Sequence, residues 1–342
     1  MLEKIKVEDA VGMRLAHDLT RIVPGEFKGA AFRKGHIVRK GDIPKLLDLG
    51  KKQLYVLKLA PGEIHEDEAA KRMAHAIAGQ GIGLRGPSEG KVDFLTRVFG
   101  LLKVNIRGVK RINAIGSLIL STRHNHSCVK PGELVAGTRI IPLSIRESKI
   151  KKVEEICKKE GPILIILHIR RKKVGIIVTG SEIFEERIRD RSAGIIREKV
   201  EKLGSKVVQT AVVPDDPLRI AEKIREMKTA GCQVIVATGG LSVDPDDVTL
   251  EGIRKAGAEV IFYGAPVLPG SMSAYGRLGK AVLLGAPACV VHDPVTALDL
   301  FLPRVLADDP ISQEEVALLG HGGFCLKCSV CRYPVCPMGK GA

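Results

Sequence analysis

Two glycine-containing turns carry residue types that can bind a phosphate. The first is Thr179-Gly180-Ser181-Glu182 and the second is Gly239-Gly240-Leu241-Ser242. Glycine lets backbone N–H groups approach a ligand without a Cβ in the way, and a hydroxyl at a helix N-terminus adds a further donor. The two turns therefore predict a phosphate-binding site in which Gly239, Gly240 and Ser242 hold the anion.

Four carboxylates accompany these turns: Glu182, Asp190, Asp216 and Asp247. In a site of low dielectric, they would repel a phosphate by several kcal/mol unless a cation were present. The cluster therefore indicates a divalent cation such as Mg²⁺. Each acid taken alone also suits a helix N-terminus, where the helix dipole favours negative charge. Because they come after the ends of successive predicted strands, we interpret them as a catalytic group.

Four cysteines near the C-terminus form a second candidate site. Cys325, Cys328, Cys331 and Cys336 fall within twelve residues, and Pro337 follows the last of them. The spacing is close to that of a ferredoxin-type cluster motif, with one extra residue before the last cysteine. Zinc also accepts four thiolates, but zinc sites usually keep two ligand pairs apart by a longer spacer. We therefore expect one metal centre, and the spacing favours a [4Fe–4S] cluster over Zn²⁺.

The elements that must position the phosphate site are parallel βαβ units. Apolar runs at 174–178 and 234–237 each end in one of the two turns, and segments with helical spacing lie between them. In such sheets, ligands bind outside the carboxyl ends of the strands. We expect helices over 187–203, with Asp190 inside its first turns, and after Asp216, and a closing helix over 294–306.

The first half of the chain predicts smaller units. A helix over 42–50 followed by a strand over 53–57 indicates a small α+β domain, and 66–77 has helical spacing. Strands separated by turn signals follow between 91 and 145. His124-Asn125-His126 lies between two of these strands, and we interpret it as a loop. The expected domains are 1–60 (α+β), 61–170 (helix and β-rich), 171–308 (α/β, doubly wound, mostly parallel) and 309–342 (Cys-rich tail).

The charge distribution separates the two halves. The net charge is +15, and residues 1–170 carry 32 of the 54 Lys and Arg residues but only 18 of the 39 Asp and Glu residues. A basic half can attract nucleic acid, but the chain has four tyrosines, eight phenylalanines and no tryptophan for stacking. We therefore favour a solvated surface. A charged N-terminus and short apolar runs indicate a cytoplasmic protein that does not enter a membrane.

The motifs between residues 179 and 270 resemble the molybdopterin-binding domain of molybdenum-cofactor biosynthesis proteins. The resemblance rests on Thr179 to Glu182, Asp190, Asp215-Asp216, Gly239 to Thr249 and Pro269-Gly270, in order and spacing. That domain occurs in molybdopterin adenylyltransferases, molybdopterin molybdenumtransferases and competence-damage-inducible-type proteins. One departure concerns the residue after Pro269-Gly270, where molybdenumtransferases place lysine and this chain has Ser271.

The resemblance implies a function and a set of residues. It implies a molybdopterin-binding, molybdenumtransferase-like transferase that inserts molybdenum or transfers an adenylyl group, works as a homo-oligomer and meets a molybdoenzyme or another cofactor-assembly protein. Two alternatives remain: a nucleotide or pyrophosphate hydrolase of the competence-damage type, and a regulator without turnover that binds a pterin or nucleic acid. The cofactor-binding residues are then Thr179, Gly180, Ser181, Gly239, Gly240, Ser242, Pro269, Gly270 and Ser271.

Overall fold

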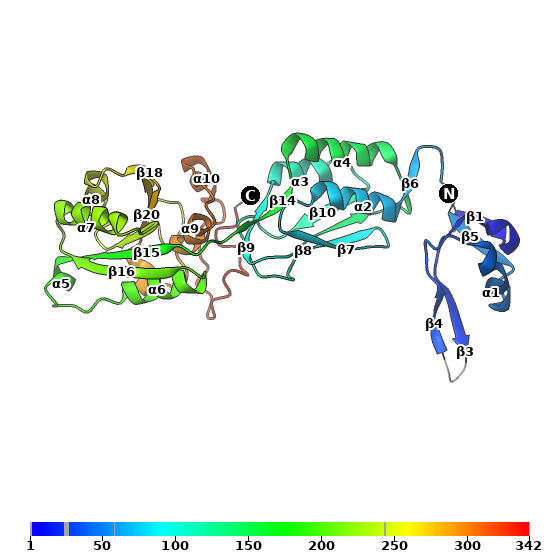
Figure 1. The fold of residues 1–342 in the computed structure, drawn as a ribbon, viewed down its shortest axis with the longest axis horizontal. Coiled ribbons are helices and arrows are strands. Elements are labelled where there is room, and N and C mark those ends of the chain that lie inside the picture. Colours follow the sequence, from blue (N-terminus) through cyan, green and yellow to red (C-terminus); the bar gives the residue numbers. More distant parts are fainter. Residues whose placement is uncertain (1, 24–26, 58, 243, 342) are drawn as a thin grey trace.

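The computed structural model describes residues 2–23, 27–57, 59–242 and 244–341. Its units follow one another along the long axis of the molecule (Figure 1). The N-terminal unit lies at one end, a middle unit follows, and an α/β unit lies at the other end. None of the helices in the described ranges is both long and apolar enough to span a bilayer.

The N-terminal unit is a small sheet with one helix, as its sequence predicts. Strands pair in the order β1-β5-β2, and β3 pairs with β4 as a hairpin. Asp42 stands at the N-cap of α1, and β5 has the predicted bounds. Val7, Leu46 and Val56 are buried in its core. The elements are β1 (Leu2–Lys6), η1 (Val7–Ala10), β2 (Arg14–Leu15), β3 (Leu19–Val23), β4 (Phe27–Phe32), η2 (Lys40–Asp42), α1 (Ile43–Asp48) and β5 (Gln53–Leu57).

The middle unit packs helices against two antiparallel sheets of order β10-β12-β8-β7 and β11-β9-β14. Its helix α2 buries Ala70, Met73 and Ile77 at helical spacing, and this spacing is why the sequence predicts a helix there. The elements are β6 (Glu63–His65), α2 (Glu66–Ile77), β7 (Ile82–Ser88), β8 (Lys91–Thr96), β9 (Gly100–Val104), α3 (Ile106–Asn113), β10 (Leu118–Thr122), β11 (Cys128–Val129), β12 (Leu134–Ile140), β13 (Ser144–Arg146), α4 (Glu147–Glu160) and β14 (Leu164–His168).

The α/β unit contains a six-stranded sheet of order β16-β15-β17-β20-β19-β18. The first four strands in that order are parallel, and β19 and β18 complete the sheet antiparallel. This confirms the predicted α/β, mostly parallel fold. The elements are β15 (Lys173–Thr179), α5 (Ser181–Phe184), α6 (Ser192–Lys202), β16 (Lys206–Val213), α7 (Pro217–Thr229), β17 (Val234–Thr238), α8 (Thr249–Lys255), β18 (Glu259–Tyr263), β19 (Ala274–Leu278), β20 (Ala281–Ala286), η3 (Ala288–Val291) and α9 (Ala297–Leu306).

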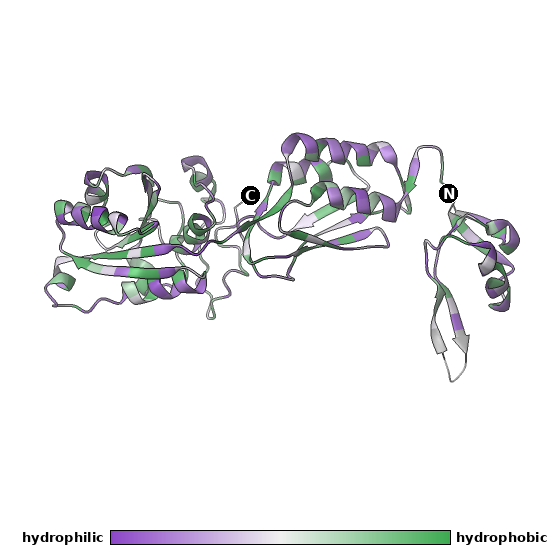
Figure 2. Cartoon of the chain, viewed as in Figure 1, coloured by the Kyte–Doolittle hydropathy of each residue, from purple (hydrophilic) through white to green (hydrophobic). Residues whose placement is uncertain are grey.

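Both faces of this sheet are buried. Ile176 and Val236 face the cluster that includes side chains of α6 and α9, whereas Ile177 and Ile235 face the cluster that includes side chains of α7 and α8. Successive residues of a strand point to opposite faces, so a strand buried on both faces is apolar throughout. Figure 2 shows the resulting hydrophobic strands and the hydrophilic outer sides of the helices.

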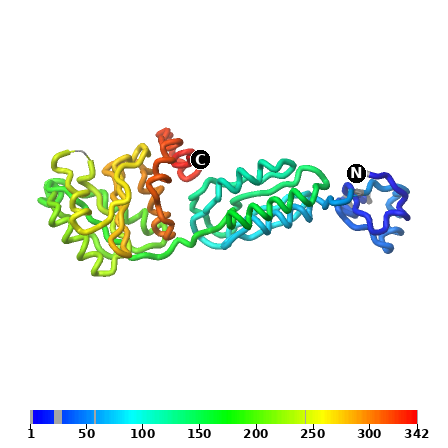
Figure 3. The backbone as a smooth tube through the Cα atoms, turned by 90° about the horizontal axis from the view of Figure 1, so that it is seen from above, coloured from blue at the N-terminus to red at the C-terminus, as the bar shows by residue number. Residues whose placement is uncertain are grey.

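The C-terminal segment packs back onto the α/β unit. It contains α10 (Gln313–Leu318), and its residues Ile311, Val316 and Met338 belong to the same core cluster as the sheet. Figures 1 and 3 both place the C-terminus beside the junction of the middle and α/β units. The predicted division of the chain at residue 308 stays a prediction, and the shared core indicates that the tail folds together with the α/β unit.

Candidate functional site

A large cavity of the α/β unit lies at the carboxyl ends of β15 and β17, where the sequence places the two glycine turns. These strands pair in parallel and end at Thr179 and Thr238. The cavity has a volume of about 1450 Å³. Among the residues that line it are Thr179, Gly180, Ser181, Glu182, Arg187, Arg189, Asp190, Arg191, Asp215, Gly239, Gly240, Ser242, Asp244, Asp246, Asp247 and His292.

The Gly239-Gly240 turn is held tightly against the end of β15. Gly239 has φ +89°, and a Cβ on it would lie 2.2 Å from the carbonyl oxygen of Thr179. Gly240 has φ +54°, and its Cβ would lie 2.7 Å from Thr249 Oγ1. The buried hydroxyls of Thr179 and Thr249 share a hydrogen bond of 2.8 Å beneath the turn. Both positions therefore require glycine, and the turn presents backbone rather than side chains to the cavity.

Asp215 anchors the first turn. The backbone N–H of Ser181 donates to Asp215 Oδ2 at 2.7 Å, and the backbone N–H of Asp215 donates to Ser181 Oγ at 3.2 Å. Gly180 has φ +148°, and a Cβ on it would lie 3.0 Å from Glu182 Oε1, so the Glu182 carboxylate lies close over the turn. The segments that follow β15 and β16 are thus joined by side-chain hydrogen bonds at the edge of the sheet.

Asp216 does not lie where the sequence predicts it. It is the N-cap of α7, and its Oδ1 accepts from the backbone N–H groups of Leu218 at 2.7 Å and Arg219 at 3.3 Å. It does not line the cavity, whereas its neighbour Asp215 does. The predicted helix start after Asp216 is correct, but the acid at the site is Asp215.

Asp190 precedes a helix rather than lying inside one. Helix α6 begins at Ser192, five residues later than the start predicted from the sequence. Asp190 Oδ1 accepts from the backbone N–H of Ser192 at 2.8 Å and from its hydroxyl at 2.6 Å, and Oδ2 accepts from Ala193 N–H at 3.1 Å. Asp190 lines the cavity while it satisfies the start of α6.

The irregular segment before α6 brings three arginines to the cavity: Arg187, Arg189 and Arg191. All three are exposed, and Arg187 also forms an ion pair of 2.9 Å with Glu185. They were missed as site residues because the sequence predicts a helix here, and alternate residues of a helix point in different directions. The signal was their alternation in Arg187-Ile-Arg-Asp-Arg191. These cations line the same cavity as the carboxylates and favour an anionic ligand.

The acidic loop after β17 is held by hydrogen bonds within the loop and by a hydrogen bond from Tyr263. Asp247 Oδ2 accepts from Asp244 N–H at 3.3 Å, and Asp247 N–H donates to the Asp244 carbonyl at 2.9 Å. The Tyr263 hydroxyl donates to the Leu241 carbonyl at 2.6 Å. Burial, and then the negative charge of Asp247, raise the pKa of Tyr263. The phenol therefore stays protonated and keeps donating to the loop at neutral pH.

A second cavity of about 350 Å³ adjoins the first and contains the remaining predicted binding residues. Pro269, Gly270 and Ser271 line it together with Gly239, Gly240, Ser242 and Asp247, which also line the larger cavity. Gly270 has φ +117°, and a Cβ on it would lie 2.5 Å from the backbone nitrogen of Ala297. The nine predicted cofactor-binding residues thus border two adjoining cavities that meet at the Gly239-Gly240 turn.

The carboxylates of the large cavity are spread around its wall. Within the described ranges, no three His, Cys, Asp or Glu side chains are close enough together to form a metal site by themselves. Mg²⁺ is usually held by one or two carboxylates together with phosphate oxygens of a substrate and water. A wall of dispersed carboxylates suits such a shared site better than an all-protein one.

The four tail cysteines line one cavity of about 170 Å³. They are free thiols, and Cys328 and Cys331 are exposed. Asp293, Lys327 and Tyr333 also border this cavity, and the Tyr333 hydroxyl donates to the Asp299 carbonyl at 3.0 Å. Four thiolates are donors suited to iron–sulfur clusters and to zinc. The described part of the chain therefore gathers the predicted ligands around a common space without arranging three of them as a ready-made metal site.

Comparison with protein families divides the chain into a part with a characterised domain type and a part without one. Residues 175–310 match a family described as a probable molybdopterin binding domain, and residues 4–58 match a domain of unknown function.

Curated relatives match part of the chain. A CinA-like protein of Mycobacterium leprae is 36% identical over 83 residues, which is 24% of this chain and 19% of that protein. The molybdopterin molybdenumtransferase of Synechococcus elongatus is 27% identical over 144 residues, 39% of this chain and 36% of that protein. The chain thus spans well under half the length of these relatives.

Among solved structures, the molybdopterin biosynthesis enzyme MoaB of Thermus thermophilus covers 41% of this chain, with 98% of its own chain covered, 21% identity and a TM-score of 0.33. A molybdenum cofactor biosynthesis protein of Pyrococcus furiosus covers 92% of this chain, with 66% of its own, 15% identity and a TM-score of 0.28. The family match over residues 175–310, together with the cavity at the carboxyl ends of β15 and β17, assigns the α/β unit to the molybdopterin-binding domain family.

Proposed function

We propose that this chain binds molybdopterin at the large cavity and acts in molybdenum-cofactor biosynthesis, with the terminal phosphate of the pterin at Gly239, Gly240 and Ser242. The observation that carries the proposal is the turn itself, which exposes backbone at the carboxyl end of a parallel strand and has no room for a Cβ. Arg187, Arg189 and Arg191 on the same wall favour an anion. They also offer cationic groups in place of the lysine missing after Pro269-Gly270.

The acids of the cavity have separate roles in this proposal. Asp247 and Asp190 are the residues that would hold Mg²⁺, which would supply positive charge beside the phosphate, and Glu182 would close the first turn. Asp215 replaces Asp216 in the catalytic group, because Asp215 faces the cavity and Asp216 caps α7. The chemistry is that of a molybdenumtransferase-like transferase, either insertion of molybdenum or transfer of an adenylyl group.

Two substitutions test the catalytic part. Asp247→Asn should lower turnover by at least about a hundredfold, because the neutral amide cannot balance a divalent cation. Asp216→Asn is the matched control, since asparagine is an equally good N-cap and the side chain lies outside the cavity. Both proteins should keep the melting temperature of the parent. Equal activity of the Asp247 variant and the parent would remove Asp247 from the mechanism.

Binding is tested without assuming turnover. Anaerobic native mass spectrometry of the purified protein should detect a bound pterin, and replacement of Arg189 by glutamine should lower its occupancy. A protein that carries no pterin and does not take one up when it is offered would contradict the proposal.

A second function is favoured by the identity to CinA-like proteins over 83 residues. In that case, the same turn and acidic loop would bind a nucleotide for hydrolysis. Metal-dependent release of AMP or inorganic phosphate from nucleotides in the absence of a pterin would favour this function over cofactor assembly.

The cysteine cavity is the proposed site of the [4Fe–4S] cluster, with Zn²⁺ as the alternative. The cluster would supply electron transfer, or docking to a molybdoenzyme. Anaerobically purified protein should absorb in the visible range, and Cys331→Ser should reduce both the absorbance and the iron content. Cys157→Ser, in the core of the middle unit, is the control. A colourless anaerobic protein with one zinc per chain would instead support zinc.

A further inference from the structure

A fourth cavity, separate from the two sites above, lies where the middle unit, the α/β unit and the tail meet. Its volume is about 390 Å³. The middle unit contributes the His124-Asn125-His126 loop, the α/β unit contributes Arg304 from α9, and the tail contributes Glu315 and Lys340. The histidine triplet, which the sequence predicts to be a loop, therefore faces a cavity formed by three distant parts of the chain.

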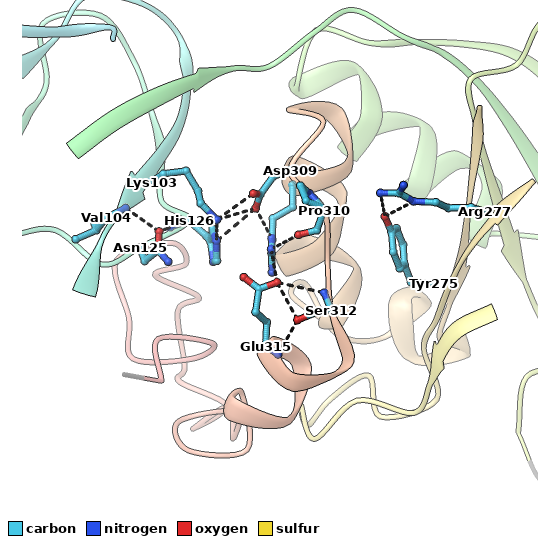
Figure 4. A network of polar contacts seen from close by, with 11 residues as sticks. Lys103, Val104, Asn125, His126, Tyr275, Arg277, Asp309, Pro310, Ser312 and Glu315 are labelled. Carbon is cyan, nitrogen blue, oxygen red and sulfur yellow. Dashed lines mark hydrogen bonds and ion pairs between the residues drawn. The ribbon is translucent and has the colours of Figure 1, made fainter. Parts of the chain in front are cut away.

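A polar network fixes the histidine side of the cavity. Lys103 Nζ donates to Asp309 Oδ1 at 2.9 Å and lies 2.8 Å from His126 Nε2 (Figure 4). Burial lowers the pKa of His126 to about 3, and the charges of Arg304 and Lys103 add to this effect. The imidazole is thus neutral at physiological pH, and its Nε2 accepts from the lysine. The ring proton must then be on Nδ1, which is a hydrogen-bond donor.

The acidic groups around the cavity are already matched by cations. Arg304 is buried and donates to Asp309 Oδ2 at 2.6 Å and to Glu315 Oε2 at 3.0 Å. Arg123, another lining residue, pairs with Glu133. These carboxylates are therefore already neutralised and do not attract a further cation.

Lys340 differs from these cations, because it forms no ion pair with any residue in the described ranges. Its side chain is half-buried in the wall of the cavity. Burial lowers the pKa of Lys340, and the nearby thiols of Cys336 and Cys128 act in the opposite direction. The Asn125 side chain is held through Oδ1, which accepts from the backbone N–H groups of Val104 and His126, both at 3.0 Å. Its NH₂ group has no hydrogen-bond partner among the described residues and remains a donor.

We propose that this cavity binds the phosphate group of a small molecule, with the Lys340 ammonium, the Asn125 amide and the His126 Nδ1–H as donors. Three segments that converge with spare donors, among them one lysine that forms no ion pair with a described residue, are complementary to a compact oxyanion. The cavity is roomier than one phosphate requires, so the ligand is either inorganic phosphate or a small phosphomonoester. This inference does not depend on the pterin site, whose turn and arginines lie at the other cavity.

Calorimetric titration of the full-length protein tests the proposal. Inorganic phosphate and phenyl phosphate are titrated separately at constant ionic strength, with sodium chloride as the compensating salt. Lys340→Gln should weaken the binding of both by about tenfold or more, since a hydrogen bond to a charged group is lost. Lys340→Arg should retain most of the affinity. Tighter binding of phenyl phosphate than of phosphate would identify the phosphomonoester as the better ligand.

Two control variants distinguish binding at this cavity from a general effect of charge and from binding at the pterin cavity. Lys158→Gln removes the same charge from the exposed face of α4 and should leave binding unchanged. Arg189→Gln should weaken any phosphate binding at the pterin cavity and should leave the binding event that depends on Lys340 unchanged. The proposal is overturned if neither ligand binds more tightly than chloride does, or if Lys340→Gln binds as the parent does while Arg189→Gln does not.

Discussion

Replacement of Gly239 by alanine tests the geometry on which the phosphate site depends. A non-glycine residue in the left-handed region costs about 1–2 kcal/mol. The new methyl carbon would also lie 2.2 Å from the Thr179 carbonyl oxygen, a backbone atom that cannot rotate away. Overpacking of this kind costs about 1–3 kcal/mol, so the sum is about 2–5 kcal/mol.

A cost of that size is comparable to a large part of the stability of a domain. Because the strain is local, we expect the loop between β17 and α8 to move away from β15 before the α/β unit unfolds. Hydrogen–deuterium exchange measured by mass spectrometry should show faster exchange in peptides that cover 238–249. Binding of the pterin or nucleotide ligand should weaken in parallel, because the backbone donors no longer face the cavity.

Gly194→Ala is the matched control. Gly194 lies within α6, and no described atom lies within 4 Å of the Cβ that alanine would add. Alanine should stabilise that helix by up to about 1 kcal/mol. The reasoning is refuted if Gly239→Ala leaves both exchange over 238–249 and ligand binding unchanged, as Gly194→Ala should.

Two further predictions concern the junction of the units. Arg304→Met removes the buried ion pair between Arg304 and Asp309 and leaves Lys103 as a cation beside that carboxylate. The free energy of unfolding, measured by urea denaturation, should therefore fall by about 1–3 kcal/mol, and an unchanged free energy would contradict this prediction. The pKa of His126 is about 3 in the folded chain and higher when unfolded, so the unfolded chain binds the extra proton. Stability should therefore fall as the pH drops from about 6.5 towards 3, and His126→Gln should flatten that slope in thermal melts. A slope identical in the variant and the parent would show that another group is responsible.

The sequence was most informative where burial imposes a pattern. Strands β15 and β17 are apolar over 174–178 and 234–237 because both faces of the sheet are covered, and α2 shows helical spacing because one face packs in the core. The parallel fold follows from such patterns together with the turns that end the strands. The glycines of the site could also be recognised from the sequence, because the backbone angles and close contacts at Gly239 and Gly240 exclude a side chain.

The side chains around the cavity were harder to assign. Asp215 and Asp216 are adjacent, and only the path of the loop decides that one holds Ser181 while the other caps α7. Arg187 to Arg191 has residues compatible with a helix, yet Asp190 caps the first turn of α6 and stops the helix from extending backwards. The junction cavity was not predictable at all, because its residues are far apart in the sequence and come together only in the folded chain.

The family match ends at residue 310, but the apolar interior around the sheet continues to Met338. Gly339 comes so close to Leu300 of α9 that a Cβ would lie 2.6 Å from its methyl carbons. A fragment that ends at residue 310 would therefore expose apolar side chains of α9 to solvent and would tend to aggregate.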